Sequence, residues 1–112
     1  MYLQHVRIAV RTGQEAAFEA ALCEVRQRVF MTGGFRGFAV AQGAEDPGTY
    51  LVEVRWESLQ ELVDFVEGRF ERAWSPVQPF LAAPLRADHF VERDGLAFQG
   101  PGVLTDLSWQ SG

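Results

Sequence analysis

The sequence is poor in cysteine and histidine. Cys23 is the single cysteine, so an intrachain disulfide is impossible and metal motifs built from cysteine pairs are excluded. His5 and His89 are the only histidines, and they stand too far apart in the chain to form a zinc-binding motif. We therefore expect neither a disulfide framework nor a bound metal.

Lysine is absent, and positive charge is scarce. All 10 basic residues are arginine, against 15 acidic residues, which gives a formal net charge of −5. The arginines are scattered from Arg7 to Arg93 without a basic run. Because phosphate contacts need clustered basic side chains, we expect no binding to nucleic acid. A negative chain also gains nothing at an anionic membrane surface.

Long apolar runs are missing as well. No stretch approaches the roughly 18 consecutive apolar residues of a membrane-spanning helix. Residues 1–11 alternate polar and apolar side chains instead of forming an apolar leader, so we expect a cytoplasmic protein. Apolar residues still make up 47% of the 112 residues and charged residues 22%, which is typical of one globular domain.

Apolar residues recur with two different periods along the chain. A period of two, typical of strands, runs through residues 2–11, 35–42, 50–56 and 85–92. A helical period runs through residues 13–31 and 59–74. The order of elements is therefore strand, helix, strand, strand, helix, strand. This order predicts an α+β, ferredoxin-like βαββαβ fold with a four-stranded antiparallel sheet and both helices on one face.

Local signals support these boundaries. Thr12 and Ser58 each stand three residues before a glutamate, the spacing of a capping box, and so predict two helix starts. Gly68 weakens the second helix in its middle, and Ser75 followed by Pro76 predicts a short new helical turn.

The two faces of the predicted sheet differ in character. The face expected to meet the helices carries Val6, Ile8, Val10, Val52, Val54 and Trp56. The opposite face carries charged or polar residues, namely His5, Arg7, Arg11, Glu53 and Arg55. Such a face is either in water or paired with a second copy of the chain. The small side chains at positions 37, 39 and 41 allow another chain to approach this face closely.

Several segments resemble the antibiotic biosynthesis monooxygenase (ABM) domain family, whose members form a dimeric α+β barrel. They are VRTGQE at 10–15, GGFRG at 33–37, EDP at 45–47, YLVEVRWES at 50–58 and DHF at 88–90. The resemblance covers residues 1–93 and implies one ABM-like domain, and it leads us to expect a homodimer. Residues 94–112 form a C-terminal tail with apolar side chains, which we expect to pack on the dimer.

The resemblance implies a cavity between the sheet and the helices that Trp56 lines. Trp56 then forms either the wall of a pocket for a flat aromatic ligand or an ordinary part of the core. Trp74 and Phe70, on the second helix, line the same cavity or pack over Trp56. Val6, on the first strand, is a further candidate for substrate contact.

Two residues are candidates for catalytic roles. Tyr50, on the face of Trp56, can donate a hydrogen bond to a ligand oxygen or satisfy its hydroxyl within the protein. His89 titrates near neutrality and can act as a general base, as can His5. His5 is expected on the face away from the pocket, where a polar contact at the dimer face is the simpler interpretation.

Family members that degrade haem use an asparagine on the first strand and a histidine on the second helix. The matching positions here hold Val6 and Val66, so we expect no haem and no other cofactor. The resemblance then favours a cofactor-independent monooxygenase acting on a small aromatic or quinol-like substrate. The alternative is a non-catalytic dimeric module that binds a small hydrophobic ligand or a partner. A titratable group beside the ligand would favour the enzyme.

Overall fold

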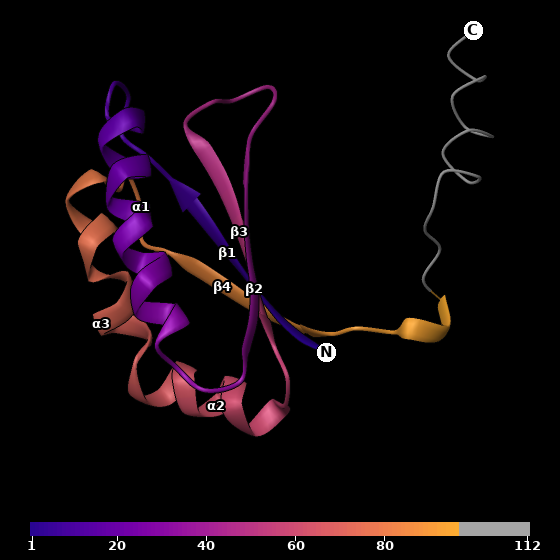
Figure 1. Ribbon diagram of the computed structural model, residues 1–112. Coiled ribbons are helices and arrows are strands. Elements are labelled where there is room, and N and C mark those ends of the chain that lie inside the picture. The colour runs from indigo at the N-terminus through magenta and orange to yellow at the C-terminus, as the bar shows by residue number, and fades with distance from the viewer. Residues whose placement is uncertain (97–112) are drawn as a thin grey trace, which may run out of the picture.

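The computed structural model describes residues 1–96 and confirms the predicted α+β, ferredoxin-like fold (Figure 1). The elements are β1 (Tyr2–Ala9), α1 (Glu15–Phe30), β2 (Phe35–Gln42), β3 (Thr49–Trp56), α2 (Leu59–Gly68), α3 (Phe70–Trp74), the 3₁₀ helix η1 (Ser75–Phe80), β4 (Arg86–Val91) and the 3₁₀ turn η2 (Asp94–Leu96). The expected packing of the C-terminal tail falls largely on residues 97–112, outside the described part of the chain.

The four strands form one antiparallel sheet in the order β2-β3-β1-β4. The helices cover one face of this sheet and leave the other face open, as Figure 1 shows. We call the first the helix-covered face and the second the open face. The two central strands, β1 and β3, therefore provide most of the core, while β2 and β4 are edges.

The core lies between the central strands and α1. Val6, Val52, Val54 and Trp56 are fully buried on the helix-covered face, as the alternation predicted. α1 meets them with residues at helical spacing, namely Phe18, Leu22, Val25 and Val29. Alternation on the strands and the 3.6-residue period on the helix thus bring two apolar surfaces together.

The predicted capping of α1 by Thr12 is wrong. The helix begins after Gln14, and no side chain caps its first turn. The chain turns at Gly13, whose φ is +85°, and the Gln14 N–H donates to the Arg11 carbonyl at 2.9 Å. This tight turn occupies Thr12, which therefore stands too early to reach the helix N–H groups.

The predicted second helix divides into two pieces. α2 is capped as expected, because the Ser58 hydroxyl accepts a hydrogen bond from the Glu61 N–H at 3.2 Å. After Gly68 the backbone leaves the helical region at Arg69, with φ −135° and ψ −11°, and α3 begins one residue later. The helical turn predicted at Ser75 and Pro76 is confirmed as η1. α3 and η1 thereby close over the core beside α1.

Candidate functional site

One polar side chain lies within the apolar core of the helix-covered face. Gln4 on β1 is completely buried, and it is the only buried polar residue in the described chain. Its Nε2 lies 3.1 Å from the His89 Nε2 of the neighbouring strand β4. Its Oε1 has no hydrogen-bond partner. Exchanging the amide oxygen and nitrogen only moves the deficit to the other atom, so one end of this amide stays unsatisfied.

Two tryptophans also have a buried polar atom without a hydrogen-bond partner. The indole Nε1 atoms of Trp56 and Trp74 are buried and have no acceptor among residues 1–96. Each unsatisfied buried donor or acceptor costs roughly 1–3 kcal/mol. The three such side-chain atoms found in residues 1–96 all belong to residues of the helix-covered core. Groups of this kind in a native structure call for an explanation, which is an ordered water or ion, stored strain or a functional role.

Aromatic rings connect these two tryptophans. Trp56, at the end of β3, lies 4.9 Å from Phe65 of α2, measured between ring centroids. Phe65 meets Phe70 edge-on at 6.1 Å, and Phe70 stacks on Trp74 of α3 at 6.0 Å. Trp56 and Trp74 are fully buried, while Phe70 is half-buried. The structure thus brings three predicted site residues, Trp56, Phe70 and Trp74, into one aromatic cluster.

Val6 lies on the same face of β1 as Gln4, two residues further along the strand, and is fully buried. It packs opposite Val52 and contributes only apolar surface. Its side chain can border a ligand near Gln4 but can neither donate nor accept a hydrogen bond.

His89 is the histidine of the helix-covered face. It lies on the edge strand β4, directly opposite Gln4, and is exposed to solvent. When the Gln4 amide nitrogen donates, the His89 Nε2 accepts and the ring proton sits on Nδ1. His89 therefore connects the buried amide with the solvent-exposed edge of the sheet.

His5 occupies the opposite face of the sheet, as its place in the alternation predicted. Its Nε2 lies 3.0 Å from a Glu53 carboxylate oxygen. Although β1 and β4 are neighbours, the two histidines are separated by the sheet, because consecutive residues on a strand point to opposite faces. His5 therefore does not contribute to the helix-covered cluster.

Tyr50 lies at the other end of β3 from Trp56, six positions away, or roughly 20 Å at about 3.3 Å per strand residue. Its hydroxyl donates to a Glu19 carboxylate oxygen at 2.5 Å and accepts from the Gln42 amide at 3.1 Å. Burial and the Glu19 carboxylate raise the pKa of Tyr50 to about 12. At neutral pH the Tyr50 hydroxyl therefore keeps its proton and donates it to the Glu19 carboxylate. The structure does not bring it together with Trp56.

Gln4 is the functional candidate that sequence reasoning missed. The alternation already places it on the face of Val6 and Ile8, where a polar side chain breaks an apolar pattern. A polar residue within an apolar strand face was the feature of the sequence that could have identified Gln4 as a candidate. The unpartnered indole atoms had no signal in the sequence, because hydrogen-bond partners depend on tertiary contacts.

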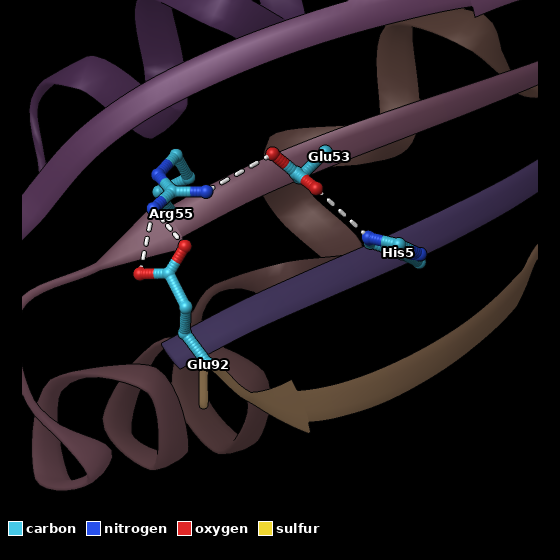
Figure 2. Close-up of polar contacts among 4 residues, drawn as sticks. All are labelled: His5, Glu53, Arg55 and Glu92. Atoms are coloured by element: carbon cyan, nitrogen blue, oxygen red, sulfur yellow. Dashed lines mark hydrogen bonds and ion pairs between the residues drawn. The ribbon is translucent and has the colours of Figure 1, made fainter. Parts of the chain in front are cut away.

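The open face carries a separate chain of polar contacts, shown in Figure 2. Glu53 holds His5 through one oxygen and Arg55 through the other, at 3.0 and 3.3 Å. Arg55 also donates to both carboxylate oxygens of Glu92, at 2.8 and 2.9 Å. This contact lowers the pKa of Glu92. Arg55 thus pairs with both carboxylates of this group.

No group of three or more histidine, cysteine, aspartate or glutamate side chains within residues 1–96 is arranged to hold a metal ion. No helix in the same range is long and apolar enough to cross a membrane.

Comparison with known proteins gives a consistent family match. Residues 1–74 match the family model described as antibiotic biosynthesis monooxygenase. A Bordetella bronchiseptica protein that carries this family name is 28% identical, with a TM-score of 0.71 over 82% of this chain and 97% of that one. A Nitrosomonas europaea protein of the same family name is 20% identical, with a TM-score of 0.68 over 82% and 98%.

SnoaB from Streptomyces nogalater, a cofactor-independent oxygenase, is more distant. It is 15% identical to this chain, with a TM-score of 0.68 over 82% of this chain and 93% of SnoaB. At this identity the likeness shows the shared fold. Among curated protein sequences, none matches the chain significantly.

Proposed function

The chain belongs to the antibiotic biosynthesis monooxygenase family, and from this premise we propose that it is a cofactor-independent monooxygenase of a small aromatic or quinol-like molecule. The observation that carries the proposal is the set of unpartnered polar atoms of Gln4, Trp56 and Trp74. SnoaB, which shares the fold, is a cofactor-independent oxygenase, so the fold is compatible with this chemistry.

The unpartnered atoms suit the needs of such a reaction. Without a cofactor, the protein has to deprotonate a phenol or an acidic C–H group and hold the resulting anion for O2. The indole N–H groups of Trp56 and Trp74 are free to donate to an anionic oxygen. The aromatic rings around them provide flat surfaces on which a planar substrate can stack.

The proposed base is His89. When the Gln4 amide oxygen accepts from the His89 Nε2–H, the Nδ1 lone pair is free to take a proton from the substrate, and the exposed ring can pass that proton to solvent. In the overall reaction an activated ring methylene and O2 give a ring carbonyl and water. One oxygen atom becomes the new carbonyl oxygen and the other leaves as water, so the four electrons taken from the methylene reduce O2 without an external reductant.

Access to this site requires movement, because Trp56 and Trp74 are fully buried. We propose that α2 and α3 move apart at Arg69, where the backbone is not helical and the two helices meet. Gly68 precedes this junction and imposes little steric restriction on its backbone. Opening here would uncover Phe70 and the indole of Trp74.

The test is oxygen consumption and anthraquinone formation with anthrone as the probe, measured on the full chain. We expect turnover, and we expect Trp56→Phe and His89→Asn to lower it at least roughly tenfold, since a single transition-state donor or base contributes that much or more. Gln60→Asn, at an exposed position on α2 outside both the core and the open face, is the control and should leave turnover unchanged.

The outcomes separate the two candidate functions. Anthrone that binds near Trp56 without being oxidised would contradict the monooxygenase proposal and favour a non-catalytic module for a small hydrophobic ligand. Equal turnover in the parent, Trp56→Phe and His89→Asn would contradict the roles proposed for these two residues.

We further propose that the protein acts as a homodimer in which a second copy covers the open face. Arg55 pairs with both carboxylates of the polar group in Figure 2, which is only about one third exposed, so covering it leaves neither carboxylate without a cationic partner. Phe90 on the same face is 49% exposed, and Ala39 on β2 allows close approach.

Light scattering during size-exclusion chromatography tests the dimer. The parent chain should elute with twice the mass of one chain, and Ala39→Arg should give a monomer. Gln60→Arg, on an exposed position of α2, is the control. A monomeric parent at concentrations of roughly 100 μM would contradict the dimer proposal.

A further inference from the structure

Three of the ten arginines of this acidic chain gather around one hollow in the helix layer, where the end of α1 meets α3. The hollow has a volume of about 460 Å³, within the usual range of small-molecule sites. Its lining includes no acidic residue and consists of Arg28, Met31, Thr32, Arg69, Arg72 and Ala73. Because the helices lie on the other side of the sheet from the open face, a second copy on the open face leaves this hollow uncovered (Figure 1).

The three arginines differ in what their side chains already contact. The Arg28 guanidinium donates to the Arg72 carbonyl and the Ser75 hydroxyl, at 2.6 and 3.1 Å. It also pairs with the Glu24 carboxylate at 2.8 Å, so its role is to hold α3 against α1. Arg69 and Arg72 are exposed, and within residues 1–96 neither side chain forms an ion pair. Their two guanidinium groups are therefore available to an added anion.

Arg69 and Arg72 also border a second hollow, with a volume of about 870 Å³. Half-buried Phe70, which stacks on Trp74, forms part of its wall. Glu67 also lines this second hollow, as does Glu71, and their negative charges disfavour an anion there. A ligand that extends across the two arginines would therefore place its negative group in the first hollow and its ring beside Phe70.

We propose that Arg69 and Arg72 bind a carboxylate of the substrate, which makes the substrate an aromatic carboxylic acid. This inference rests on the proposed function and adds the charge of the molecule that is oxidised. Arginine suits the role because its planar guanidinium donates two parallel hydrogen bonds to a carboxylate. A chain with a net charge of −5 repels anions at long range, and arginines gathered without acids offset this repulsion locally.

The place of Arg69 connects this anion site with the proposed entrance. It is the junction residue at which α2 and α3 are proposed to separate, and Phe70 follows it directly. The carboxylate would stay at the surface on the two guanidinium groups while the rings enter toward the indole of Trp74. Neutral anthrone lacks this contact and should therefore bind more weakly than a carboxylated analogue.

Anthraquinone-2-carboxylate and anthraquinone-2-carboxamide are the probes, since they share a ring system, differ in charge and are not oxidised. We expect isothermal titration of the full chain to show the carboxylate binding at least roughly tenfold more tightly than the carboxamide. Arg69→Gln and Arg72→Gln should each weaken carboxylate binding at least roughly threefold, as expected for exposed ion pairs. The double variant should bind both probes equally, with unchanged affinity for the carboxamide. Arg26→Gln, an exposed arginine of α1 outside both hollows, is the control and should keep the preference.

Circular dichroism shows whether each variant is folded, and the arginine variants should melt within about 3 °C of the parent. Equal affinity of the parent for the two probes would overturn this inference alone and leave the proposed function standing, as would a preference that the double variant retains. Binding of neither probe would overturn the inference together with the proposed aromatic site. An arginine-dependent preference without any oxidation of anthrone would support the anion site and contradict the monooxygenase proposal.

Discussion

Replacing Gln4 with leucine should stabilise the protein while impairing its proposed activity. The buried amide has one unpartnered atom, which costs roughly 1–3 kcal/mol, and the variant removes that cost. Leucine buries about two more apolar carbons than glutamine, which adds roughly 1.6 kcal/mol at about 0.8 kcal/mol each. The lost contact with His89 offsets about 0.5–1.5 kcal/mol, since exposed His89 can bind water instead. The net gain is at least about 1 kcal/mol.

Urea unfolding followed by circular dichroism measures this change directly, and the melting temperature should rise by about 4 °C for each kcal/mol. Gln60→Leu, an exposed position on α2, is the matched control and should change stability by less than about 0.5 kcal/mol. Anthrone oxidation should fall in Gln4→Leu, because His89 loses the amide that orients it. A loss of more than about 1 kcal/mol of stability in Gln4→Leu would refute the reasoning, since it would mean that the amide is satisfied in the native protein.

Two further predictions concern stability. Ser58→Ala should destabilise the protein by about 1 kcal/mol, because it removes the cap of α2. Thr12→Ala should cost less than about 0.5 kcal/mol, because Thr12 does not cap α1. Equal losses of stability in urea unfolding would contradict this assignment of the caps. Tyr50 has a folded-state pKa of about 12 against 10.0 when unfolded, so above pH 10 the unfolded chain releases its proton first. Stability should therefore fall as the pH rises from about 10 to 12, and Tyr50→Phe should show a shallower fall in pH-dependent urea unfolding; identical slopes would contradict the burial of this hydroxyl beside Glu19.

Much of the fold was predictable because it depends on periodicities that are local in the sequence. Val6, Val52 and Val54 alternate with polar neighbours, and this alternation assigned the correct sheet face. Ser58 capped α2 as its spacing with Glu61 predicted. The start of α1 was predicted wrongly, because the positive φ of Gly13 decides where the helix begins and a spacing rule does not include it.

The candidate site was less predictable, because it depends on which atoms find partners. The sequence identified the aromatic residues Trp56, Phe70 and Trp74, and the structure brings them together. It gave no sign that two indole groups would be buried without acceptors. Tyr50 was grouped with Trp56 because both side chains share a strand face, but six strand positions separate them.

The central claim is that the indole N–H groups of Trp56 and Trp74 bind an oxygen atom of the ligand, and nuclear magnetic resonance tests it most directly. The two N–H resonances are assigned with the two Trp→Phe variants and are then followed during titration with anthraquinone. The quinone carries the carbonyl oxygen that the proposed reaction forms and is not itself consumed. We predict that both N–H resonances move downfield as they gain an acceptor, and that Gln4→Leu weakens the effect. Saturating binding that leaves both resonances in place would contradict the account, because the ligand would then lie outside the core of the helix-covered face.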